Sequence, residues 1–140
     1  MTDDEIVTTL RGRGSPALTS IGGQVVAYDS RRKEVTMSFE ATPAMCHSRV
    51  IVQGGFITAM VDSAMAYAAM GAYQGRVAVP TLEIKVSFLK AGNPGPMISK
   101  ARALRLGRTV GFLEAELFQA DTLIATSSST VRIIIPDAAR

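Results

Sequence analysis

Strict alternation of apolar and polar residues marks the second half of the chain. The clearest segment is VPTLEIKVSFLKAG at 79–92. Within it, Leu82, Ile84, Val86 and Phe88 alternate strictly with Thr81, Glu83, Lys85 and Ser87. After a turn at 93–96, three more strands are predicted at 97–107, 109–120 and 122–136. Short links of this kind usually join antiparallel neighbours, so the pattern predicts a meander of four strands.

The first half begins with a short helix and a hairpin. Residues 2–13 start with the cap candidate Thr2 and acidic residues and end with basic ones, an order that helices prefer. Residues 21–40 predict two strands joined by a polar turn at 29–33. The connection at 41–50, broken by Pro43, is expected to be irregular.

A long apolar helix is predicted between the hairpin and the meander. It begins at Gln53 and runs to Met70, with Gly71 and Gly75 as the stop signal. Five large or apolar residues share roughly one face: Phe56, Met60, Ala64, Tyr67 and Met70. Since few residues on any face are charged, the helix is expected to be wrapped nearly all round.

These elements together predict an α+β architecture, in which one curved antiparallel sheet of about six strands wraps one long central helix. A chain of 140 residues suits a single domain spanning 1–140, with residues 1–20 as an N-terminal flank.

Composition excludes several classes of function. The net charge of +3 is too small for a nucleic-acid footprint, and one Cys and one His cannot form a structural zinc site or an internal disulfide. No secretory signal opens the sequence, and Gln53, Thr58 and Asp62 interrupt the one run that resembles a membrane span. We therefore expect a cytoplasmic protein with no metal, no nucleic-acid partner and no membrane association.

The motifs QGGFITAMVDSA, TLEIKVSFLKAG and ARALRLGRTVGFLEAELFQADTLIATSSSTVRI resemble the hotdog-fold acyl-CoA thioesterases, especially the phenylacetate-pathway type. The resemblance covers about residues 21–135 and implies the hotdog fold. Two positions depart from the pattern: Gln53 replaces the family's His before the paired glycines, and His47 stands six residues earlier, where Asn is frequent. A glutamine still donates and accepts hydrogen bonds at neutral pH.

The resemblance implies a thioester hydrolysis site. The Gly54 amide would polarise the substrate carbonyl beside Gln53, Asp62 would act as general base or nucleophile, and the Thr81 hydroxyl would assist that acid. The residues alone leave other interpretations open. The glycines suit a tight turn, Asp62 could be held by the backbone or by Thr58 and Ser63, and Thr81 could face solvent.

Candidate substrate-binding residues are less specific. Gly55 lets the backbone approach a ligand, and Ser63 is one of the small residues that leave room for an acyl chain. His47 could orient water or substrate. Three basic residues near strand ends could bind the phosphates of coenzyme A: Lys90, Arg105 and Arg108. Each of these residues could equally be solvated surface. Coenzyme A enters as part of the substrate, and no other cofactor is expected.

The spacing of the two main candidates has a consequence for assembly. Gly54 and Asp62 are eight residues apart, so on one helix they are separated by roughly 12 Å. They cannot both contact one thioester carbon, which indicates that Gly54 of one subunit meets Asp62 of another. The expected assembly is a homodimer or homotetramer with sites at the subunit interface.

Two other functions remain open at this stage. A non-catalytic acyl-CoA binding or sensing protein on the same fold is favoured by Gln53 and opposed by Asp62. A hotdog dehydratase or hydratase would use a His with an acid, and His47 does not stand in that sequence setting.

Overall fold

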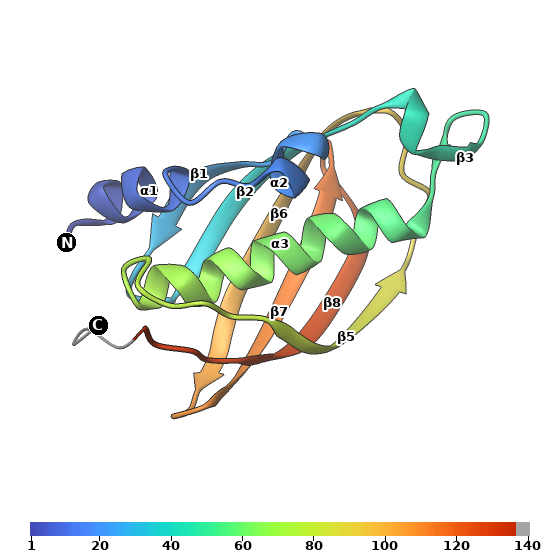
Figure 1. Cartoon of the computed structure of the whole chain (residues 1–140). Coiled ribbons are helices and arrows are strands. Elements are labelled where there is room, and N and C mark those ends of the chain that lie inside the picture. The colour runs from blue at the N-terminus through green and yellow to red at the C-terminus, as the bar shows by residue number, and fades with distance from the viewer. Residues whose placement is uncertain (137–140) are drawn as a thin grey trace.

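The computed structural model describes residues 1–136 (Figure 1). Its helices are α1 (Asp3–Arg11), α2 (Pro16–Ser20) and α3 (Gly54–Ala72), with a 3-10 turn at Pro43–Met45. Its strands are β1 (Gln24–Asp29), β2 (Glu34–Ala41), β3 (Cys46–Ser48), β4 (Ile51–Val52), β5 (Thr81–Phe88), β6 (Gly95–Leu106), β7 (Val110–Gln119) and β8 (Thr122–Arg132).

Six of the strands form one antiparallel sheet in the order β1-β2-β6-β7-β8-β5, which curves around α3 (Figure 1). The predicted wrapped-helix architecture is confirmed. The predicted four-strand meander is wrong, because β5 pairs with β8 at the sheet edge and β6 lies between β2 and β7. The link at 89–94 can extend to roughly 20 Å, enough to pass the ends of β8 and β7 at about 4.8 Å per strand.

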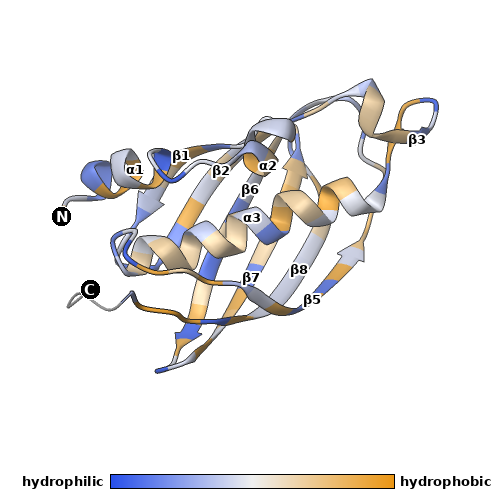
Figure 2. Cartoon of the chain, viewed as in Figure 1, coloured by the Kyte–Doolittle hydropathy of each residue, from blue (hydrophilic) through white to orange (hydrophobic). Residues whose placement is uncertain are grey.

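Most of α3 is buried against the inner face of the sheet, and Figure 2 shows its largely apolar colouring. Of the five residues predicted to share a face, Phe56 is 36% exposed and the other four are buried. One strip of the helix is incompletely covered within the chain, and it consists of small and polar residues: Gly55, Thr58, Ala59, Asp62, Ser63 and Ala66. The helix is therefore wrapped on all sides except along this strip.

The C-terminal end of α3 differs from the prediction at Gly71, which lies inside the helix. A Cβ at Gly71 would lie 2.2 Å from the Tyr28 ring, and the Tyr28 hydroxyl donates to the Ala68 carbonyl at 3.0 Å. Burial, with Asp3 and Asp29 nearby, raises the Tyr28 pKa and keeps this donor protonated. Gly75 (φ 79°) supplies the predicted stop, since its N–H bonds the Met70 carbonyl at 2.9 Å.

Two further segments refine the sequence predictions. The predicted N-terminal helix is present, capped by Thr2, and this flank buries Ile6 and Leu10. The connection at 41–50, expected to be irregular, contains β3, which pairs with β4 in a small hairpin. This hairpin projects from the end of the molecule and leads directly into α3 (Figure 1).

Candidate active site

Asp62 lies in the middle of α3 and is bonded by Thr81, the first residue of β5. The Thr81 hydroxyl donates to Asp62 Oδ1 at 2.6 Å, a length typical of a hydroxyl donating to a carboxylate. Both residues are half-buried. Of the structural partners considered for the carboxylate, Thr58 donates instead to the Gly54 carbonyl at 2.8 Å, and within residues 1–136 neither Ser63 nor a backbone N–H bonds Asp62. The solvent-facing interpretation of Thr81 is wrong.

A β-bulge explains why Thr81 faces the helix although the alternation of β5 placed it outward. Thr81 is paired with Val131 and Glu83 with Thr130, so Leu82 is an extra residue on β5. The extra residue turns Thr81 to the inner face, where its partner Val131 is buried, and leaves Leu82 59% exposed. The bulge thereby brings the hydroxyl to the carboxylate.

The N-terminus of α3 forms the second group of candidate residues. Gln53 is the N-cap residue, and its side chain makes no capping hydrogen bond. The Gly54 and Gly55 N–H groups have no hydrogen-bond partner within residues 1–136, as expected for the first turn of a helix. A Cβ at Gly54 would lie 3.0 Å from the Phe88 ring, whereas one at Gly55 would meet nothing within 4 Å. These N–H groups can therefore receive an acceptor from a ligand.

An open cavity of about 390 Å³ adjoins Gly54. Its lining comes from the β3–β4 hairpin, the start of α3 and the segment after β5: His47, Ile51, Val52, Gly54, Ile57, Phe88, Leu89, Lys90, Ala91 and Gly92. The His47 ring is exposed, with Nδ1 2.9 Å from the Ser48 hydroxyl. The structure thus brings Gly54, His47 and Lys90 together. Phe88 was not among the predicted site residues, although its alternation with the polar residues of β5 was evident from the sequence.

The three basic candidates do not form one cluster. Lys90 lies beside the Gly54 cavity. Arg105 is paired with Phe112, which is 45% exposed on the outer face, and Arg108 follows in the β6–β7 turn. This turn lies at the far end of the sheet from the β3–β4 hairpin (Figure 1).

Gly54 and Asp62 lie on one continuous helix, Gly54–Ala72, as the spacing argument required. Asp62 and Ser63 do not line the Gly54 cavity. Within one chain the site therefore consists of two separate halves. One half offers backbone N–H donors beside a cavity, and the other offers a hydroxyl-bonded carboxylate.

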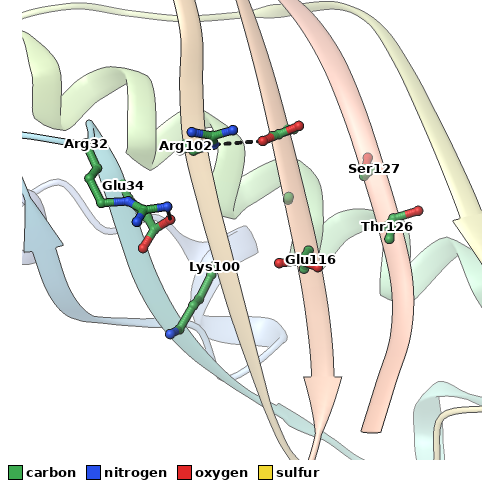
Figure 3. A pocket seen from close by; sticks show the side chains of 9 residues that line it. Arg32, Glu34, Lys100, Arg102, Glu116, Thr126 and Ser127 are labelled. Atoms are coloured by element: carbon green, nitrogen blue, oxygen red, sulfur yellow. Dashed lines mark hydrogen bonds and ion pairs between the residues drawn. The ribbon is translucent and has the colours of Figure 1, made fainter.

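A different depression, of about 360 Å³, lies on the outer face of the sheet (Figure 3). It is lined by basic and acidic side chains in equal number, Arg32, Lys100 and Arg102 with Glu34, Glu114 and Glu116, next to Thr126 and Ser127. Arg102 Nε is 2.7 Å from Glu114 Oε1. None of the candidate residues lines this depression, and its charges balance.

Comparison with known proteins identifies the class. The thioesterase superfamily model matches residues 51–126, more than half of the chain. The chain belongs to this superfamily and has the hotdog fold of its phenylacetate-related, PaaI-like branch. The protein is a thioester hydrolase. No curated protein matches the chain in sequence.

Solved structures of similar proteins share this fold. A phenylacetic acid degradation-related protein from Ralstonia eutropha JMP134, classified as a thioesterase, is 30% identical, with coverage of 91% of this chain and 98% of that one and a TM-score of 0.82. The E. coli PaaI protein from the phenylacetic acid degradation operon is 17% identical, with 96% coverage of both chains and a TM-score of 0.82. A Haemophilus influenzae thioesterase is 17% identical, with coverage of 92% and 90% and a TM-score of 0.81.

Two properties complete the description of residues 1–136. None of the helices in this range combines the length and apolarity that crossing a membrane requires. The same residues contain no group of three or more His, Cys, Asp or Glu side chains arranged to hold a metal ion.

Proposed function

We propose that this protein hydrolyses an acyl- or aryl-CoA thioester to the free acid and coenzyme A. The observation that carries the proposal is the half-buried Asp62 carboxylate, held by Thr81 at 2.6 Å on an otherwise uncharged helix of a thioesterase-superfamily chain. A carboxylate in such a place needs either a structural partner network or a chemical task. A single hydroxyl donor leaves its second oxygen available for chemistry.

In the proposed reaction, Asp62 removes a proton from a water molecule that attacks the thioester carbonyl carbon. Alternatively, the carboxylate attacks that carbon itself and water hydrolyses the resulting anhydride. In either course the carbonyl oxygen becomes an oxyanion, which the Gly54 N–H stabilises at the positive end of α3. The carbon–sulfur bond then breaks, and coenzyme A leaves as the thiolate.

Each complete site would combine Gly54 of one subunit with Asp62 of its partner. Three features support a homodimer: β5 is an edge strand, Leu82 and Phe88 on it are exposed apolar side chains, and the strip of α3 that contains Asp62 is uncovered. Two such dimers would form the homotetramer. In this assembly Gly55 and Ser63 lie along the substrate path, with Gln53, His47 and Lys90 at the cavity.

Substrate phosphates would meet Lys90 at the cavity and, from a neighbouring subunit, Arg105 or Arg108 at the end of β6. The proposal of a CoA ester as substrate is tested by a hydrolysis screen of acyl- and aryl-CoA esters with detection of the free thiol. Turnover of at least one ester is expected. Absence of turnover across short, medium, long and aromatic acyl groups would refute it.

Mixed dimers test whether the sites form in trans. An Asp62→Asn subunit combined with a Gly54→Val subunit contains one intact pair, so random exchange should restore roughly a quarter of wild-type activity. Valine is suitable because any Cβ at Gly54 approaches the Phe88 ring. Each variant alone should be nearly inactive. Proven subunit exchange without recovery would contradict the shared site.

Thr81→Val tests the hydroxyl that holds the carboxylate. Valine keeps the shape and removes the donor at 2.6 Å, so kcat is expected to fall about tenfold while the protein stays folded. Thr81→Ser retains a hydroxyl and should recover most of the loss. The measurement is steady-state kinetics on the ester that the wild type prefers. An unchanged kcat in Thr81→Val would remove the hydroxyl from the proposed mechanism.

A further inference from the structure

The only asparagine of the chain, Asn93, joins three segments at the end of the sheet. Its N–H donates to Gln119 Oε1 at 2.9 Å, and its carbonyl accepts from Gln119 Nε2 at 2.7 Å. Its side-chain Nδ2 donates to the Val50 carbonyl at 2.9 Å. Asn93 therefore connects the link after β5, the end of β7 and the β3–β4 hairpin.

The hairpin depends on these contacts because β3 and β4 are very short, and an isolated two-stranded hairpin is only marginally stable. Two hydrogen bonds join this hairpin to residues 92–93. The Val52 N–H donates to the Gly92 carbonyl at 2.9 Å, and the Val50 carbonyl accepts from the Asn93 side chain. Residues 92–93 thus hold the β3–β4 hairpin through one main-chain and one side-chain hydrogen bond. The main-chain N–H of Asn93 is already bonded to Gln119. The Asn93 side-chain amide therefore makes the hydrogen bond to the hairpin that a main-chain N–H would otherwise make.

The same contacts join two walls of the cavity beside Gly54. The hairpin contributes His47, Ile51 and Val52 to one wall, and residues 88–92 form the other. The second wall is fixed to the sheet, because Leu89 N–H donates to the Ile124 carbonyl at 2.8 Å and Gln119 holds Asn93. The hairpin is consequently the wall whose distance from the other can change.

We propose that Asn93, held in place by Gln119, is a positioning residue that sets the width of this cavity and thereby the fit of the substrate. The assignment rests on the proposed function, because the cavity is taken as the place where the acyl-CoA ester passes Gly54. Asn93 acts through Val50 and the hairpin and does not contact the reacting atoms.

The first test measures hydrogen–deuterium exchange of the hairpin, which does not depend on activity. In Asn93→Ala and Asn93→Asp, neither of which can donate to Val50, the amides at 46–53 are expected to exchange about tenfold faster. Amides in the buried part of α3 should be unaffected. Unchanged exchange of the hairpin, or equal acceleration throughout the protein, would overturn the proposal.

Gln24→Ala is the matched control for Gln119→Ala. Gln24 is an exposed amide on β1, at the opposite edge of the sheet from β5, and its side chain makes no hydrogen bond within residues 1–136. Gln119→Ala should accelerate hairpin exchange as Asn93→Ala does, and Gln24→Ala should not. Similar behaviour of the two glutamine variants would overturn the role given to Gln119.

The second test is kinetic. In the Asn93 variants KM for a hydrolysed CoA ester is expected to rise about fivefold, with kcat within about twofold of wild type. A fall in kcat at unchanged KM, or no change in either, would overturn the role in substrate fit. If the wild type hydrolyses no CoA ester, the proposed function fails, and the exchange experiment still decides whether Asn93 positions the hairpin.

Discussion

Asp62→Asn is expected to lower turnover of the preferred CoA ester at least about a hundredfold, because the amide cannot act as a base or nucleophile. The substitution is nearly isosteric, and the new side-chain oxygen can still accept from Thr81 at the position of Oδ1. The free energy of unfolding should therefore change by less than about 1 kcal/mol. Turnover and thermal melting are measured on the same preparation.

Asp121→Asn is the matched control for this substitution. Asp121 is an exposed carboxylate in the β7–β8 turn that neither lines the Gly54 cavity nor takes part in the Thr81–Asp62 hydrogen bond, so its variant should retain wild-type turnover. Binding of the substrate should persist in Asp62→Asn, since the Gly54 N–H is unaltered. Full activity in well-folded Asp62→Asn protein would remove Asp62 from the mechanism. Lowered melting with normal turnover would indicate a structural role.

Gly71→Ala is expected to have the largest effect on stability, lowering the free energy of unfolding by about 2–3 kcal/mol. Alanine inside a helix is ordinarily more favourable than glycine by up to about 1 kcal/mol. At this position, however, a Cβ would lie 2.2 Å, 2.5 Å and 2.8 Å from three atoms of the Tyr28 ring. Chemical denaturation followed by circular dichroism measures the difference.

Gly55→Ala on the same helix is the control for this prediction. A Cβ at Gly55 meets no heavy atom within 4 Å, so the variant should be neutral or slightly more stable. The cost of Gly71→Ala should also decrease in a Tyr28→Leu background, where the ring is absent. Equal effects at the two glycines, or an undiminished cost without the ring, would contradict close packing of α3 on Tyr28.

The sequence by itself determined the main elements and their class. Local periodicity was sufficient for the central helix, the hairpin at 21–40 and the four later strands, since residues close in sequence decide which face each side chain takes. It also singled out Asp62, because a carboxylate in an apolar helix is conspicuous without any structure. The rise of a helix per residue was sufficient to show that Gly54 and Asp62 of one chain cannot both contact one thioester carbon.

Only the tertiary structure decided which elements meet. Strand β5 pairs with β8, and Gly71 packs closely against the Tyr28 ring. Both contacts join segments that are far apart in sequence. The clearest case is Thr81, whose side chain could face solvent according to the alternation of β5. Whether a strand gains a bulge depends on its partner strand, and the bulge at Leu82 turns the Thr81 hydroxyl toward Asp62. Pairing partners of this kind leave no local pattern in either segment.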